Sequence, residues 1–150
     1  FKPKKEDQEV GITIFRTQVD HIDLGIIRNK NSQLSLRFRA TGPDAPAPKT
    51  VPVPKGWEHG SIRLFIETAN ATHYNLGAEN NGKKVNVATA EARLVSFGAG
   101  QFVGSLLGAY ATCNGQGKGL ECPPGGEAYV QQWNYEGKAQ EIDHGVFVKS

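Results

Sequence analysis

The residues best suited to chemistry are carboxylates, because acid–base hydrolysis needs a proton donor and a second carboxylate flanking the bond. The candidates are Asp23, Glu58, Glu67, Glu127, Glu136 and Asp143. None of them lies in a supporting motif. Glu67 alternates with Arg63, and Arg37 and Arg39 alternate in the same way on another segment. This pattern favours cross-strand pairs of arginine and carboxylate, so we predict no catalytic residue.

Two histidine–aspartate pairs could bind a metal ion or orient one another. His21 and Asp23 are two positions apart on one predicted strand, and Asp143 precedes His144. An imidazole and a carboxylate suit a transition metal, but each pair needs a further ligand. Calcium needs more oxygen atoms than either pair supplies. We therefore favour hydrogen-bonded or solvated pairs and predict no metal and no cofactor.

Aromatic residues are the better functional signal. Trp133 and Tyr135 fall on one face of a predicted strand, and Trp57 lies in a loop. Sugars present apolar C–H faces bordered by hydroxyls, so an aromatic wall with polar neighbours suits them. We therefore predict Trp57, Trp133 and Tyr135 as carbohydrate-binding residues. The alternative is that Trp133 and Tyr135 fill the core, which we favour for Trp133. For Trp57, an interface and a binding site are equally favoured.

The elements that must position these residues are short strands, because the chain alternates apolar and polar residues with a period of two. Gln33–Arg39 alternates strictly, and Ser61–Thr68 repeats the pattern. Further strands are predicted at Glu9–Arg16, His21–Arg28, Lys49–Val53, His73–Ala78, Val85–Ala88, Phe102–Ala111, Ala128–Glu136 and Gly145–Lys149. Ten short strands at this spacing predict an all-β, two-sheet antiparallel β-sandwich in one domain spanning residues 1–150.

Turn residues separate these strands. Asn80-Asn81-Gly82 suits a tight hairpin because Asn and Gly tolerate positive φ. The proline-rich stretch Pro43–Pro54 predicts a loop leading to an edge strand, since proline cannot donate to a sheet ladder. A helix is weakly indicated, with one turn at most within Ala88–Leu94.

The composition excludes two classes of partner. Hydrophobic residues make up 38% and charged residues 21% of the 150 positions, and the formal net charge is +2. The positive residues are scattered, whereas nucleic-acid binding needs a basic patch and an anionic membrane needs a basic cluster. The apolar runs are far too short to cross a bilayer. We therefore predict neither a nucleic-acid nor a membrane partner.

Two local features point to an oxidising compartment. Cys113 and Cys122 lie nine positions apart in a glycine-rich loop. A disulfide between them is favoured over two free thiols, and a metal site lacks ligands. Asn70-Ala71-Thr72 is an acceptor pattern for N-glycosylation at Asn70. Together these features predict a secreted, extracellular protein.

Several segments, taken in order, resemble one family. They are Glu9–Phe15, His21–Gly25, His59–Glu67, Gly100–Ala111 and Ala128–Tyr135. Their order resembles the C-terminal concanavalin-like β-sandwich (a jelly roll) of glycoside hydrolase family 43, in its fungal β-xylosidases and α-L-arabinofuranosidases. The resemblance covers nearly all of the chain.

The resemblance implies a role without catalysis. In that family the sandwich follows a five-bladed β-propeller that holds the catalytic carboxylates. The chain, which begins at Phe1 and has no methionine, is then expected to be a C-terminal part of a larger protein. A strand is expected to be missing before Phe1 and to be supplied by the remainder of the parent. The implied partners are the catalytic propeller and a plant cell-wall oligosaccharide. The alternatives are a free-standing lectin or carbohydrate-binding protein, and a purely structural domain.

Overall fold

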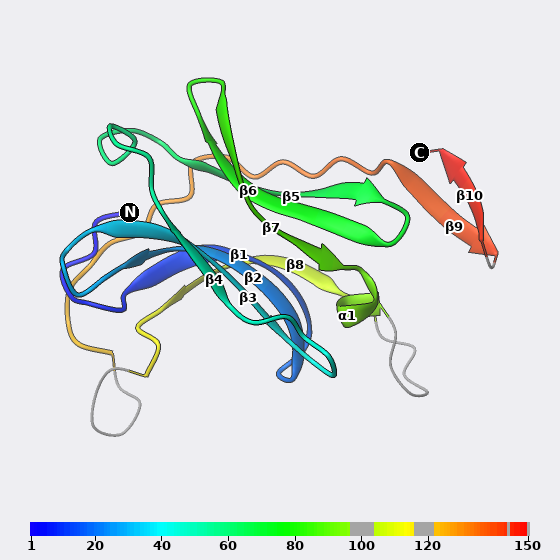
Figure 1. The fold of residues 1–150 in the computed structure, drawn as a ribbon, viewed down its shortest axis with the longest axis horizontal. Helices are drawn as coiled ribbons and strands as arrows, with labels where there is room; N and C mark the ends of the chain where they lie inside the picture. The colour runs from blue at the N-terminus through cyan, green and yellow to red at the C-terminus, as the bar shows by residue number, and fades with distance from the viewer. Residues whose placement is uncertain (97–103, 116–121, 144, 150) are drawn as a thin grey trace.

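The computed structural model describes residues 1–96, 104–115, 122–143 and 145–149. Strands β4–β3–β2–β1–β8 form a five-stranded antiparallel sheet, and β5–β6–β7 form a three-stranded one. The bounds are β1 Glu9–Thr17, β2 Asp20–Arg28, β3 Leu34–Thr41, β4 Lys49–Pro52, β5 Arg63–Asn70, β6 His73–Asn80, β7 Lys83–Glu91 and β8 Leu106–Thr112. Figure 1 shows the two sheets as separate layers, which confirms the predicted two-sheet β-sandwich.

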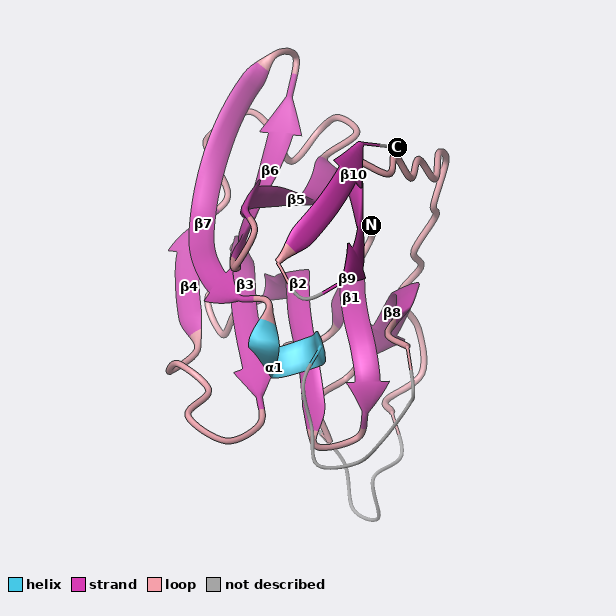
Figure 2. Cartoon of the chain, turned by 90° about the vertical axis from the view of Figure 1, so that its right-hand side faces the viewer, coloured by secondary structure: helices cyan, strands magenta, loops and turns pink. Residues whose placement is uncertain are grey.

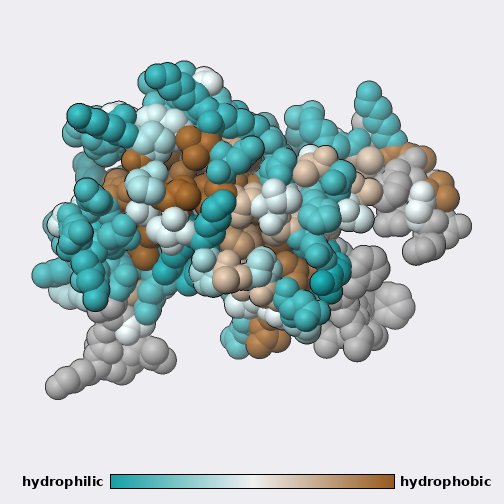
Figure 3. Space-filling view, in the orientation of Figure 1, coloured by the Kyte–Doolittle hydropathy of each residue, from teal (hydrophilic) through white to brown (hydrophobic). Residues whose placement is uncertain are grey.

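The core lies between the layers and follows the alternation of the strands. Ile22, Leu24 and Leu36 are fully buried on the five-stranded sheet, and Leu76 and Ala78 face them from β6. Each fully buried aliphatic side chain contributes roughly 1.5–3 kcal/mol to folding. Hydrophilic residues cover most of the face seen in Figure 3, and a group of hydrophobic residues reaches the surface near its middle.

Most of the predicted strands are present, with ends shifted by a few residues. Phe102 and Val103, at the start of one predicted strand, lie outside the described residues. The Asn80–Gly82 hairpin is confirmed, because Asn81 and Gly82 both have positive φ (48° and 74°) between paired Asn80 and Lys83. The proline-rich loop leads to β4 at the edge of the five-stranded sheet, as predicted.

The predicted strand Ala128–Glu136 is wrong. Residues 128–138 form no strand, and a short strand follows instead, β9 Ala139–Asp143, paired with β10 Val146–Lys149. Alternation alone cannot supply a neighbouring strand, and a ladder needs one. A single helical turn, α1 Arg93–Ser96, follows the end of β7 (Figure 2).

On β5 the predicted faces hold, but the burial differs. Arg63 and Glu67 point away from the core, as predicted, yet Phe65 on that same outer face is the most buried residue of the strand. Its ring occupies the space above Gly77, and the Lys84 ammonium lies 4.2 Å from the ring centroid. A cation over an aromatic ring stabilises this arrangement.

Candidate functional site

The most organised polar cluster lies on the outer face of the five-stranded sheet. We call it the outer-face network: Glu9, Asp23, Arg37, Arg39, Tyr110 and Asn114. Successive side chains of a strand point to opposite faces, so the residues that alternate with the core leucines and isoleucines gather here. The register places Arg37 beside Gly25, Gly25 beside Gly11, and Gly11 beside Tyr110, in one row across four strands.

Two glycines make room for the network. A Cβ at Gly11 would lie 2.7 Å from the Tyr110 ring, and one at Gly25 would lie 2.6 Å from the Tyr110 hydroxyl and closer still to Glu9. Real Cβ atoms do not approach other atoms so closely. The Tyr110 ring and the Glu9 carboxylate can therefore lie flat on the sheet only because both positions lack a side chain.

Glu9 is the centre of the network. Its side chain is 0% exposed. The Tyr110 hydroxyl donates to Oε1 over 2.7 Å, Asn114 Nδ2 donates to Oε2 over 3.0 Å, and the Arg37 guanidinium forms an ion pair with Oε2. A buried carboxylate is tolerated only when it is paired and hydrogen-bonded in this way. Burial raises the pKa of Tyr110, and the negative charge of Glu9 raises it further, so Tyr110 stays a donor.

The second carboxylate is held by the second arginine. Arg39 Nη2 lies 3.2 Å from Asp23 Oδ2, and its Nη1 donates to Asn114 Oδ1 over 3.0 Å. Burial lowers the pKa of Arg39, but Glu9, Tyr110 and Asp23 together raise it above its ordinary value. His21 Nε2 lies 3.5 Å from the same Asp23 oxygen. Two arginines thus neutralise two carboxylates on one sheet face.

This arrangement can stabilise the sheet, but it is poorly suited to acid–base chemistry. Glu9 is not accessible to a substrate, and Arg39 binds Asp23 directly. The expected cross-strand pairing of arginines and carboxylates is therefore confirmed for Arg37 and Arg39. Sequence reasoning missed Glu9, although Glu9, Gly11 and Thr13 form a polar face that alternates with Val10 and Ile12.

The other candidate carboxylates lie at the surface. Glu67 binds Lys84 over 2.8 Å, Glu136 binds Lys138 over 2.6 Å, and Glu58 lies 3.8 Å from His59. Glu127 accepts a hydrogen bond from Tyr129 over 3.1 Å. The side chain of Asp143 and the whole of His144 lie outside the described residues.

Among the described residues, no group of three or more His, Cys, Asp or Glu side chains could hold a metal ion. No helix there is long and apolar enough to cross a bilayer.

The three predicted carbohydrate-binding aromatics are in different environments. Trp57 is 5% exposed and belongs to the core, so its predicted sugar contact has no open ring face in this structure. Its loop turns back over the core through a hydrogen bond from Trp57 N to the Pro54 carbonyl. Trp133 is 52% and Tyr135 70% exposed, so the expectation that Trp133 fills the core is wrong. These two rings lie on the unpaired segment 128–138, which is why they are not covered.

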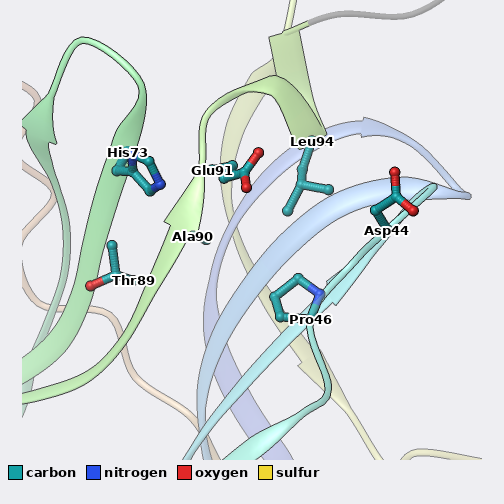
Figure 4. Close-up of a pocket in the computed structure, with 7 residues that line it drawn as sticks. All are labelled: Asp44, Pro46, His73, Thr89, Ala90, Glu91 and Leu94. Atoms are coloured by element: carbon teal, nitrogen blue, oxygen red, sulfur yellow. The ribbon is translucent and has the colours of Figure 1, made fainter.

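A hollow of ≈ 310 Å³ lies where the end of the three-stranded sheet meets the β3–β4 loop (Figure 4). It is lined by Asp44, Pro46, His73, Thr89, Ala90, Glu91 and Leu94. Arg93 pairs with Glu91 and lies 3.7 Å from Asp44. The hydrogen bond from Arg93 lowers the pKa of Glu91. The carboxylates at its rim are therefore already partnered.

The predicted Cys113–Cys122 disulfide is present, with 5.4 Å between the Cα atoms. It follows Thr112, the last residue of β8, and Asn114 beside it reaches the network. Asn70 lies in the exposed β5–β6 turn, where its Oδ1 accepts hydrogen bonds from the backbone and hydroxyl of Thr72. Glycosylation of Asn70 stays a prediction.

Comparisons with known proteins agree with this architecture. A family model described as "Beta xylosidase C-terminal Concanavalin A-like domain" matches residues 1–135. A curated "Xylosidase/arabinosidase" of Butyrivibrio fibrisolvens is 26% identical over 118 residues, which are 77% of this chain and 22% of that protein. A solved structure titled "Bacteroides ovatus Xyloglucan PUL GH43B" superposes with a TM-score of 0.63 at 30% identity, again over 77% of this chain and 22% of that one. The chain thus spans about a fifth of the length of these relatives.

Proposed function

The chain belongs to the family of β-xylosidase C-terminal concanavalin A-like domains, and on that premise we propose that it is the accessory, non-catalytic sandwich of a xylan- or arabinan-degrading glycoside hydrolase of family 43. Its partner in this proposal is the catalytic propeller of the same parent. The observation that carries the proposal is the family match over residues 1–135. The alignments cover only 22% of each relative, so both relatives are several times longer than this chain.

The outer-face network supports a role without catalysis. Glycoside hydrolysis needs an acid and a second carboxylate that both reach the bond. Here the buried carboxylate Glu9 is held by Arg37 and Tyr110, and Asp23 is held by Arg39. The catalytic pair is therefore expected elsewhere in the parent.

Hydrolysis assays test this proposal. The isolated chain should release no chromophore from aryl β-xylosides or aryl α-L-arabinofuranosides, because we expect the catalytic carboxylates in the remainder of the parent. The intact mass of the source protein should be several times 16.2 kDa, the mass of this chain. Clear turnover by the chain, or a source mass equal to it, would refute the accessory role.

The finer part of the proposal is contact with a plant cell-wall oligosaccharide through Trp133 and Tyr135. Both rings are exposed, and they lie two positions apart on the segment 128–138. Calorimetry with xylo- and arabino-oligosaccharides should give a Kd of about 1 mM or tighter. Trp133→Ala should abolish the heat, and Val19→Ala, at another exposed apolar position, should leave it unchanged. No heat with any of these sugars contradicts the contact.

A free-standing lectin remains the second candidate function. The exposed aromatics favour it, and a source protein of 16.2 kDa that binds oligosaccharide would establish it. Secretion and glycosylation at Asn70 are part of the proposal and are supported by the Cys113–Cys122 disulfide. Both relatives named above are bacterial, so a fungal source has no support beyond the original resemblance.

A further inference from the structure

The hollow of Figure 4 lies where three segments from distant parts of the chain come together. On the three-stranded sheet His73 of β6 is paired in register with Glu91 of β7, and Thr89 lies two positions earlier on the same face. The β3–β4 loop lies opposite and supplies Asp44, and Leu94 of α1 lies between Glu91 and Asp44 in Figure 4. Polar groups from both sides therefore converge on one space.

The floor of the hollow is apolar. Ala90 and Leu94 line it although both belong to the buried core, and the exposed ring of Pro46 adds an apolar wall. Such a floor suits the apolar C–H face of a small ring. The volume of ≈ 310 Å³ is at the lower end of the roughly 300–1,000 Å³ that small-molecule pockets span. The hollow is therefore sized for one small ring.

Arg93 determines which charge the hollow accepts. Its Nε forms an ion pair with Glu91, and its Nη1 lies 3.7 Å from Asp44 Oδ2, so one guanidinium bridges the two carboxylates. It occupies the position that a metal ion or an ammonium group would need. The two carboxylates disfavour an anion, because like charges repel at this range. The ligand that fits is therefore neutral.

The polar groups of the hollow keep hydrogen-bonding capacity for a ligand. Each carboxylate accepts about four hydrogen bonds, and its pairing with Arg93 uses only part of that capacity. The Thr89 hydroxyl donates to Asn75 Oδ1 over 2.9 Å, so its oxygen can still accept. The His73 ring contacts Thr72 Oγ1 through Nδ1 over 2.8 Å, which leaves Nε2 for another partner. Several hydroxyl acceptors around an apolar floor complement a polyol.

We propose that this hollow binds one neutral sugar ring of pentose size. The C–H face of the ring lies on Ala90 and Leu94, and its hydroxyls donate to Thr89 and to the carboxylates of Asp44 and Glu91. The choice of a pentose rests on the proposed function, because xylan and arabinan are built from pentoses. The site itself is separate from the sugar contact proposed for the exposed aromatic rings.

An NMR titration of the Trp133→Ala chain tests the proposal, because that variant lacks the other proposed sugar contact. D-xylose or L-arabinose should shift the amide signals of Thr89, Ala90 and Glu91 and saturate with a Kd of about 10 mM. A Kd of this size gives little heat at millimolar sugar, so calorimetry and NMR report the two contacts separately. Shifts that never saturate, or that glycerol reproduces at equal concentration, overturn the proposal.

Thr89→Val provides a matched test, because valine keeps the shape of threonine and removes the hydroxyl. It should raise the Kd about fivefold or more, the effect of losing one hydrogen bond of ordinary strength. Thr50→Val, at an exposed position of β4 outside the hollow, should leave the Kd unchanged. Both positions are exposed, so both variants should keep the amide spectrum of a folded chain. An equal Kd for the two variants counts against the proposal.

Charged probes test the bridging role of Arg93. Methylammonium that binds more tightly than D-xylose would make the hollow a cation site, and sulfate that binds more tightly would make it an anion site. Either result overturns the proposal. A failed titration leaves the accessory function intact, because the hydrolysis and mass measurements do not depend on the hollow. Clear hydrolysis by the isolated chain would instead remove the accessory function without changing the Kd of the hollow.

Discussion

The hydroxyl of Tyr110 lies 2.7 Å from Oε1 of Glu9, although the two residues are 101 positions apart in the sequence. The bond joins β8 to β1 across the outer face of the sheet, above two glycines. In chain order β1 is the first strand of the larger sheet and β8 is its last, and the two are neighbours in that sheet. The stability of the sandwich should therefore depend on this contact.

Removing the Tyr110 hydroxyl should destabilise the domain. Tyr110→Phe leaves one oxygen of a buried carboxylate without its donor, which typically costs about 1–3 kcal/mol. Urea unfolding followed by circular dichroism measures the change. Tyr129→Phe removes a similar hydroxyl–carboxylate bond at an exposed position and should change the unfolding free energy by less than about 0.5 kcal/mol. Equal effects of the two substitutions would contradict the structural role of Glu9.

The same tyrosine predicts a loss of stability at high pH. Burial, and then Glu9, raise the pKa of Tyr110 above its ordinary value of 10.0. Below pH 10 both the folded and unfolded chains hold the proton, so the contribution is complete. Above pH 10 the unfolded chain releases its proton first, so stability falls as pH rises toward the folded pKa. The unfolding free energy of the wild type should decline more steeply between pH 9 and 11 than that of Tyr110→Phe.

Gly25 should not tolerate a methyl group. Gly25→Ala places a Cβ against the Tyr110 hydroxyl and the Glu9 carboxylate, and overpacking of this kind typically costs about 1–3 kcal/mol. Gly108→Ala is the control on the same face, because its Cβ would lie 3.7 Å from Thr13, an ordinary contact. Thermal unfolding should show a lower Tm for Gly25→Ala only. A normal Tm would indicate that Tyr110 does not lie flat on the sheet.

Loss of the Cys113–Cys122 disulfide should lower stability by roughly 2–3 kcal/mol, because the link removes loop entropy from the unfolded chain. Cys113→Ser with Cys122→Ser, compared with the oxidised wild type in urea, measures this change. Thiol titration of the denatured protein without reductant should detect no free thiol. Two free thiols per chain would contradict the disulfide, and the proposal of secretion would lose its main support.

Much of the architecture could be predicted from local sequence. Strict alternation, as in Leu34, Leu36 and Phe38, specifies which face of a strand is buried, because the side-chain period of a strand is two. The Asn81-Gly82 turn and the cysteine pair are likewise local, since backbone tolerance and a short loop decide them. The pairing of Arg37 and Arg39 with carboxylates followed from charge alternation.

The identity of the partners was not local. Glu9 and Tyr110 meet only because β8 pairs with β1, and no spacing in the sequence reports a contact across 101 positions. For the same reason the sequence did not predict that Trp57 is buried and Trp133 exposed. A loop residue is buried when its turn folds back over the core, and an alternating segment stays exposed when it has no neighbouring strand. The sequence by itself thus determined strands, faces and turns, because these depend on nearest neighbours. Only the tertiary structure decided which faces meet, because burial depends on what lies opposite.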